Sequence, residues 1–367
     1  MKAFNRTAAV SITAVCLAGL IFYGASKTET NQRILNSSQF KDGIFVNPNG
    51  VRSQFFTAET WSTGKKFLFE KRIDPRPAEG IPVVPLKTED WTNPDPAKLR
   101  FAWLGHSSIL IALEGTLVLA DPVFDRRVSP FTWMGPERFS PPPVTAAGLP
   151  PLDVVLITHD HFDHLEQPTI MAISGKTALF IVPLGVRNLM LEWGIPAEKV
   201  IELDWWESHK YKSITLTATP AVHYASRGLF DFNTRLWVSW AINGAEKSAF
   251  ISGDSGYFGA FKTVGEKLGP FDAAFLKIGA YSDEGTWRAM HMTPEEAVQE
   301  CLDLRGKVMI PHHWATYDLG LHPWKEPMDR AVKSARERGV FMAAPLQGQA
   351  VDMAAIPEVD EWWKRVK

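Results

Sequence analysis

The chain has 367 residues, of which 45% are hydrophobic and 22% charged, a composition typical of a folded globular protein. Its formal net charge is −2, and no block of like charges occurs, so nothing in the sequence favours nucleic-acid binding. Only Cys16 and Cys301 could supply thiolates, which excludes a thiolate-rich metal site. Any metal must therefore be held by histidines and carboxylates.

The first residues are typical of an export segment. Lys2 and Arg6 precede an apolar stretch from about Ala8 to Ala25, as in a signal peptide. The stretch is also about long enough to span a bilayer, so an uncleaved anchor is the alternative. We expect residues 1–26 to be a signal peptide or a membrane anchor. The positive flank predicts a folded domain outside the cytoplasm, in the periplasm if the source is a Gram-negative bacterium.

The rest of the chain divides into regions that differ in composition and in hydrophobic pattern. Residues 27–98 are rich in polar residues, proline and aromatics without clean periodicity, and we expect a linker and an irregular N-terminal extension. From Leu99 onward, short apolar runs separated by Gly, Pro and Asp mix with helical segments, which indicates an α/β or α+β sandwich. We expect the main domain over residues 99–350 and a C-terminal tail over residues 351–367.

Five apolar runs of the main domain share one property, because each leads into a side chain able to bind metal or substrate. Strands that release such groups at their ends gather them along one edge of a sandwich and hold them more rigidly than long loops do. The five runs are 116–120 before Asp121, 153–158 before His159, 214–218 before His223, 249–253 before Asp254, and 307–311 before His312 and His313.

The central feature is the run His159-Asp160-His161-Phe162-Asp163-His164. In a tight turn after a strand, His159 and His161 can face one ion, while Asp163 and His164 turn towards a second. Imidazoles and a carboxylate without thiolates suit zinc, with iron and manganese as alternatives. The run predicts a two-metal hydrolytic centre.

Neither ion is satisfied by this run alone. The ends of the other predicted strands offer further donors, namely His223, Asp254 and one of His312 or His313. Asp254 lies in the segment Gly253-Asp254-Ser255-Gly256, where glycines allow close approach of the backbone, which suits a carboxylate that bridges two cations.

Two further histidines, His291 and His106, lie where they could contact a substrate or a metal ligand. Thr293, Pro294 and Glu296 form a helix start, with threonine as the N-cap and glutamate three residues later. His291 therefore precedes a helix N-terminus, which favours an anion such as phosphate. His106 follows a Trp-Leu-Gly turn before another strand, where it could orient a metal ligand.

At these residues the chain resembles the metallo-β-lactamase superfamily and, within it, the family of N-acylphosphatidylethanolamine-hydrolysing phospholipase D. The central histidine run is typical of the whole superfamily, whereas flanking segments that cover most of residues 45–325 carry the narrower resemblance. These segments are Phe45-Val-Asn-Pro48, Trp103-Leu-Gly-His106, Asp121-Pro-Val-Phe124, Arg127-Val-Ser-Pro130, Met134-Gly-Pro-Glu-Arg-Phe139, Gly253-Asp-Ser-Gly-Tyr257, Ile278-Gly-Ala-Tyr281, His291-Met-Thr-Pro-Glu-Glu-Ala297 and His313-Trp-Ala-Thr-Tyr317.

The resemblance implies a four-layer αββα metallo-β-lactamase sandwich with two zinc ions per chain. It implies the ligands His159, His161 and His223 for one ion, and Asp163, His164 and His313 for the other, with Asp254 bridging. It selects His313 over His312, because the family ligand directly precedes the tryptophan. Asp121 and His291 match positions beside the family's catalytic centre, so that together with Asp163 they are the expected catalytic residues. Asp121 would hold a water or support a metal ligand.

The implied reaction is a phospholipase D-type hydrolysis of N-acylphosphatidylethanolamine or a related phospholipid by metal-activated water. The expected partners are this lipid and a membrane surface or anchor, without nucleic acid and with a homodimer left open. Lys277 departs from the family, which tends to have an apolar residue or proline there, and Ser107-Ser108 replaces a more usual Ala-Thr. These departures leave substrate identity open.

Two alternatives to this reaction remain. One is another hydrolase on the same scaffold, acting on a lactone, a β-lactam or a soluble phosphodiester. The other is a membrane-tethered, non-catalytic metal-binding protein, which retained ligands without metal-dependent turnover would favour.

Overall fold

The computed structural model describes residues 32–51, 62, 65–66, 72–131, 133–283 and 285–367. The export segment expected over residues 1–26 lies outside this range. Within the described ranges, no helix combines the length and the apolar character that crossing a bilayer requires.

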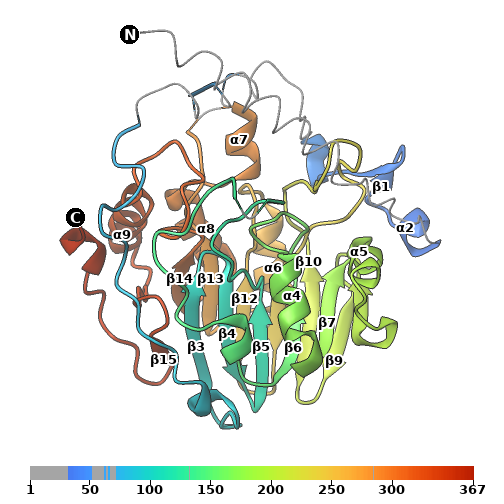
Figure 1. Ribbon diagram of the computed structural model, residues 1–367, viewed down its shortest axis with the longest axis horizontal. Helices are drawn as coiled ribbons and strands as arrows, with labels where there is room; N and C mark the ends of the chain where they lie inside the picture. Colours follow the sequence, from blue (N-terminus) through green and yellow to red (C-terminus); the bar gives the residue numbers. More distant parts are fainter. Residues whose placement is uncertain (1–31, 52–61, 63–64, 67–71, 132, 284) are drawn as a thin grey trace.

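Two mixed β-sheets form the centre of the protein (Figure 1). The seven-stranded sheet has the order β15 (Ala350–Asp352), β3 (Leu99–Gly105), β4 (Ser108–Leu113), β5 (Thr116–Ala120), β6 (Leu152–Leu156), β7 (Thr177–Pro183) and β8 (Val200–Leu203). Pairing is antiparallel from β15 to β5 and parallel from β5 to β8.

The six-stranded sheet has the order β14 (Val308–His312), β13 (Ala273–Lys277), β12 (Ser248–Ile251), β11 (Ser239–Asn243), β10 (Ile214–Thr219) and β9 (Ser208–Tyr211). Its first three strands pair in parallel, and the other pairs are antiparallel. A separate ribbon of β1 (Phe40–Lys41) and β2 (Ile44–Phe45) precedes both sheets.

Helices cover the outer faces of both sheets. On the seven-stranded sheet, α5 (Val186–Glu192) packs on β7 and β8, and α4 (Gln167–Ile173) lies on the same side (Figure 1). On the six-stranded sheet, α8 (Pro294–Asp303) packs on β13 and β14 and contacts α6 (Ala260–Leu268) and α9 (Glu326–Arg338). The short helices α2 (Gln32–Asn36) and α7 (Gly285–Met290) lie outside these two groups.

The sandwich arises from strands with apolar side chains on both faces. In β3, Phe101 and Trp103 point into the core between the sheets, whereas Ala102 and Leu104 pack towards the outer helices. Phe101 meets Phe275 of the opposite sheet edge to face, with ring centroids 5.1 Å apart. The predicted αββα sandwich is confirmed.

The five strands predicted before candidate ligands are all present. β5 has the predicted bounds, and the other four differ by a few residues at their ends. The largest differences concern β6, which ends at Leu156 and not at Thr158, and β12, which ends at Ile251 and not at Gly253. In β6 the reason is that Ile157 and Thr158 already belong to the loop that carries the histidine run.

The regions predicted to flank the main domain also pack on it. Ile34 and Phe45 of the N-terminal extension join the core between the sheets. Residues 351–367, predicted as a tail, contribute Val351 to the edge strand β15 and bury Trp362 and Trp363 in the same core.

Candidate metal centre

The histidine run forms the loop after β6, as predicted, and a buried ionic network holds this loop. His164 N and Leu165 N both donate to His161 O, at 3.0 and 2.8 Å, which makes a tight turn. The Asp160 carboxylate belongs to none of the candidate ligand groups. It accepts a hydrogen bond from Arg235 Nη1 at 2.8 Å and one from Ser226 N at 3.0 Å.

Arg227 bridges the two ends of the loop that carries the histidine run. Its Nη1 donates to Asp160 O at 2.6 Å and to Leu165 O at 2.7 Å, so one guanidinium holds both ends of the run. The sequence reasoning missed Arg227 and Arg235. Both follow His223 within a dozen residues, but no motif of that segment gives either arginine a role.

A first group of ring nitrogens comes from His159, His161 and His223. His161 Nδ1 lies 2.9 Å from His159 Nε2 and 3.3 Å from His223 Nε2, so the three can face one ion. His223 Nδ1 lies 3.2 Å from Met290 O, which leaves Nε2 without a proton for the metal side. Asn47 of the N-terminal extension fixes the His223 backbone through hydrogen bonds to its N–H and C=O, at 2.9 and 2.7 Å.

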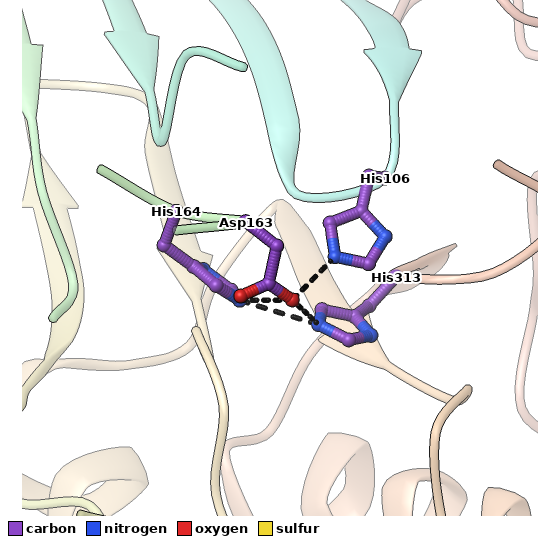
Figure 2. A group of neighbouring side chains, drawn as sticks. All are labelled: His106, Asp163, His164 and His313. Atoms are coloured by element: carbon purple, nitrogen blue, oxygen red, sulfur yellow. Dashed lines mark hydrogen bonds and ion pairs between the residues drawn. The ribbon is translucent and has the colours of Figure 1, made fainter. Parts of the chain in front are cut away.

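A second group consists of His106, Asp163, His164 and His313 (Figure 2). His313 Nε2 lies 3.2 Å from His164 Nε2 and 3.5 Å from Asp163 Oδ2. Asp163 Oδ2 in turn lies 2.9 Å from His106 Nε2. The sequence reasoning placed His106 near a ligand, and the structure identifies this neighbour as Asp163.

Asp254 lies between the two groups. Its Oδ1 is 3.1 Å from His313 Nε2 and 3.5 Å from His164 Nε2, whereas its Oδ2 is 3.8 Å from His223 Nε2. Each oxygen therefore faces a different group, which is the arrangement that a bridging carboxylate requires. The side chain is buried, and Oδ1 accepts no hydrogen bond from the described residues.

The structure places the two candidate histidines of β14 on different sides. His313 follows the strand and joins the second group, whereas His312 is buried within β14 with Nε2 3.4 Å from Ser252 Oγ. Successive side chains along a β-strand point to opposite faces of the sheet, which separates neighbouring side chains in this way. The geometry thus favours the residue that the family resemblance selects.

Asp121 is buried behind the second group. Its Oδ2 lies 2.7 Å from His164 Nδ1 and accepts from Thr158 Oγ1 at 2.6 Å, while its Oδ1 accepts from Thr158 N at 2.8 Å. Thr158 Oγ1 also lies 3.0 Å from His159 Nδ1. Of the two roles expected for Asp121, this position matches the support of a metal ligand.

His291 lies beside Asp254 and ahead of α8. Its Nδ1 is 3.6 Å from Asp254 Oδ2, and its ring packs edge to face on His223 at 5.0 Å between centroids. The predicted helix start is confirmed, since Thr293 and Glu296 form a capping box.

Burial sets the protonation of most of these rings. It lowers the pKa of His159, His223 and His313 well below the ordinary value, so these rings are neutral at pH 7. Burial also disfavours the imidazolium of His164, but three surrounding carboxylates, Asp254 first among them, outweigh it and raise the pKa of this ring to about 9. A cation at this position would therefore replace a proton.

A cavity of about 360 Å³ opens over both groups. Its polar wall consists of the candidate site residues His161, Asp163, Asp254, His291 and His313 together with Tyr224, Ser226 and Arg227. Its apolar wall consists of Val128, Pro136, Phe162, Leu229, Trp287 and Leu319. The arrangement can hold a molecule that joins a polar reacting centre to an apolar body.

The residues present fit two metal ions. The donors are imidazole nitrogens and carboxylate oxygens, their mutual distances match ligands of common ions, and the buried Asp254 Oδ1 has no other partner among the described residues. An αββα sandwich with such a centre at the ends of its strands has the parts that a metal-dependent hydrolase requires.

Comparisons with known proteins agree with this class. Residues 116–314 match the model of the Beta-lactamase superfamily domain. An uncharacterized protein of Mycobacterium tuberculosis is 39% identical over 332 residues, which cover 89% of this chain and 88% of that protein. N-acyl-phosphatidylethanolamine-hydrolyzing phospholipase D 1 of Caenorhabditis elegans is 38% identical over 270 residues, covering 70% of this chain and 75% of that protein.

A solved structure shows the same fold. The isothiocyanate hydrolase from Delia radicum gut bacteria superposes with a TM-score of 0.55 at 17% identity, covering 69% of this chain and 98% of that chain. The chain thus belongs to the metallo-β-lactamase superfamily and, within it, to the family that contains the N-acyl-phosphatidylethanolamine-hydrolyzing phospholipases D. It is a metal-dependent hydrolase, and the resemblance identified from the sequence is confirmed.

Proposed function

We propose that the protein is a phosphodiesterase of the phospholipase D type that hydrolyses N-acylphosphatidylethanolamine or a related phospholipid. The observation that carries this proposal is the position of Asp254, which turns one oxygen to each of two donor groups beneath a cavity with an apolar wall. The relatives in Caenorhabditis elegans and Saccharomyces cerevisiae named for this reaction support the substrate class.

In this proposal two zinc ions occupy the centre, with iron or manganese as alternatives for the same donors. His159, His161 and His223 would hold one ion, Asp163, His164 and His313 the other, and Asp254 both. When bound, the ions supply Lewis acidity and activate water for attack on phosphorus.

The chain's own groups then bind and orient the lipid. His291 lines the cavity, and burial lowers its pKa well below the ordinary value, so the neutral ring can donate one hydrogen bond to a phosphoryl oxygen. Leu229, Trp287 and Leu319 offer apolar contacts for an acyl chain. Asp121 acts only through His164 and Thr158, as a positioning residue.

We further propose that the enzyme meets its substrate at a membrane surface outside the cytoplasm. Leu229 lines the cavity, and the neighbouring Phe230 is 80% exposed. Trp133, in the segment between the cavity residues Val128 and Pro136, is 63% exposed. Exposed aromatic rings at the border of a lipid-binding cavity suit contact with a bilayer interface. The apolar segment after Lys2 and Arg6 supports export or anchoring.

The test is turnover of N-acylphosphatidylethanolamine in mixed micelles, beside bis(p-nitrophenyl) phosphate, a lactone and a β-lactam, with metal content measured on the same samples. We expect two metals per chain and release of phosphatidic acid from the lipid. His161→Ala and Asp254→Asn should lower turnover by several orders of magnitude. His209→Ala is the matched control, since this residue lies in the edge strand β9.

Three results would contradict the proposal. Wild-type rates in both site variants would remove the metal centre from the reaction. Turnover of only the soluble diester, the lactone or the β-lactam would assign a different substrate to the same centre. Two bound metals without turnover of any of these compounds would favour the non-catalytic alternative.

A further inference from the structure

His106 occupies a rigid position beside the second donor group. It lies in the turn between β3 and β4 with φ of 51°, and its side chain is buried. His106 N donates to Thr316 Oγ1 at 2.7 Å, and His106 O accepts from His313 N at 2.9 Å and from Trp103 Nε1 at 2.9 Å. The bonds with Thr316 and His313 tie the turn to the loop that carries His313, and the bond from Trp103 holds the turn to its own strand β3, so the ring has little freedom.

The ring reaches Asp163 through one nitrogen. His106 Nε2 lies 2.9 Å from Asp163 Oδ2, and Figure 2 shows the ring aimed at this oxygen from the turn above it. A carboxylate oxygen can only accept, so Nε2 must carry the proton. The other nitrogen, Nδ1, is then an acceptor, and it is buried without a hydrogen-bond partner among the described residues.

His313 presents the complementary case. Its Nε2 faces His164, Asp163 and Asp254, as a metal ligand would, so its proton belongs on Nδ1. That Nδ1 is likewise buried and without a partner in the part of the chain that the structure describes. A ligating histidine usually donates this proton to a carboxylate, a carbonyl or a water.

Both rings line one small cavity. Its volume is about 20 Å³, which is enough for one water molecule, and the His106 and His313 ring centroids are 3.9 Å apart. A water there can accept a hydrogen bond from His313 Nδ1 and donate one to His106 Nδ1, so each of the two nitrogens gains a hydrogen-bond partner.

We propose that His106 is a positioning residue that fixes two ligands of the second metal ion at once. It donates from Nε2 to Asp163, which aims the other lone pairs of this carboxylate at the metal. At Nδ1 it accepts from a buried water that holds His313 in the Nδ1–H form. The proposal rests on the metal centre proposed above, but not on the identity of the substrate. The competing role for His106 is that of a metal ligand itself, since Nε2 lies among the second group.

The first test compares His106→Ala with His106→Gln in metal binding, measured by competition with a chromophoric chelator. His106→Ala should weaken binding of one of the two ions by roughly 10- to 100-fold and leave the other unchanged. In His106→Gln the side-chain amide can still donate to Asp163, so binding should stay within a few-fold of wild type. His209→Ala serves as the control for loss of an imidazole elsewhere.

The outcomes separate the two roles. Equal losses in both His106 variants would identify a ligand, and wild-type affinity in His106→Ala would remove any role at the metal; either result overturns the proposal. Because no substrate is present, this experiment can succeed even if the lipid phosphodiesterase activity is absent.

A second measurement uses the wild-type protein, so it does not depend on the folding of a variant. Nitrogen-15 NMR of histidine-labelled, zinc-loaded protein reports which ring nitrogen carries the proton. We expect the Nε2–H form for His106 and the Nδ1–H form for His313. A proton on His106 Nδ1, or zinc bound at His106 Nε2, would refute the proposal.

Discussion

Asp121 offers the sharpest test of how this centre is built, through the substitution Asp121→Asn. The carboxylate accepts three hydrogen bonds, from Thr158 N, Thr158 Oγ1 and His164 Nδ1. As long as Asp121 Oδ2 accepts from His164 Nδ1, the lone pair of this ring stays on Nε2, which faces the metal position. The Thr158 hydroxyl, since it donates to Asp121, is free to accept from His159 Nδ1 and thereby orients a ligand of the first group too.

Asparagine cannot reproduce this pattern. If its oxygen accepts from Thr158 N, its amide nitrogen faces both Thr158 Oγ1 and His164 Nδ1. That nitrogen only donates, so it favours a His164 ring with the proton on Nε2 and blocks the lone pair that a metal needs. In the opposite amide orientation, the asparagine side-chain NH2 group faces the Thr158 backbone N–H, and both of these groups are donors.

The expected magnitude follows from what groups behind metal ligands contribute elsewhere. Loss of such a partner typically lowers metal affinity by roughly 10- to 100-fold, or about 1.4 to 2.8 kcal/mol. Both ions should bind more weakly in Asp121→Asn, because the carboxylate orients one ligand of each group. Thr158→Val should weaken mainly the ion of the first group, since it leaves the contact between Asp121 and His164 in place.

The assay is zinc affinity by chelator competition, together with the thermal unfolding midpoint of the metal-free protein. Asp360→Asn is the matched control, because this aspartate is exposed and forms only a surface ion pair with Arg365. Wild-type affinity for both ions in a folded Asp121→Asn protein would refute the reasoning.

Three further predictions concern stability and metal dependence. Asp160→Asn should lower the free energy of unfolding of the metal-free protein by roughly 3 kcal/mol in urea titrations, because buried Arg235 loses one of its two carboxylate partners; an unchanged midpoint would contradict this. Lys277→Met should raise that free energy at pH 7 by about 3 kcal/mol, because burial lowers the pKa of the ammonium from 10.5 to about 8. The folded chain then releases this proton at lower pH than the unfolded chain does, so the wild type gains stability as the pH rises from about 8 to 10.5. The stability advantage of the variant should therefore disappear over this pH range. An advantage that does not change with pH would disprove the charge argument. Exhaustive chelation should abolish turnover and added zinc should restore it, whereas full activity in protein shown to be free of metal would exclude the proposed chemistry.

Lys277 illustrates what the comparison of sequence and structure adds. From the sequence it is only a departure from the family pattern. The structure buries its ammonium in β13, where it donates to Gly279 O and lies close enough to Asp254 and Asp163 for their charges to raise its pKa against the larger effect of burial. This departure from the family pattern thus places a basic side chain near the metal centre.

The sequence by itself predicted an α/β or α+β sandwich, the five strands that end near the site and most of the candidate ligands, with His312 and His313 left as alternatives. Apolar runs reveal strands through their period and length, and a dense histidine run in a turn has few structural uses other than metal binding. The resemblance added the four-layer αββα architecture, the choice of His313 and the complete ligand set of each ion, because it compares whole segments and not single residues.

Only the tertiary structure decided which groups support the ligands. Asp160 pairs with Arg235 across 75 residues, Asn47 clamps His223 across 176, and His106 meets Asp163 across 57. Such contacts leave no periodic pattern, since each depends on where two distant loops come together at the edge of the sandwich. The histidine run predicts the metals, and the packing around it decides how firmly and in which tautomer each ligand is held.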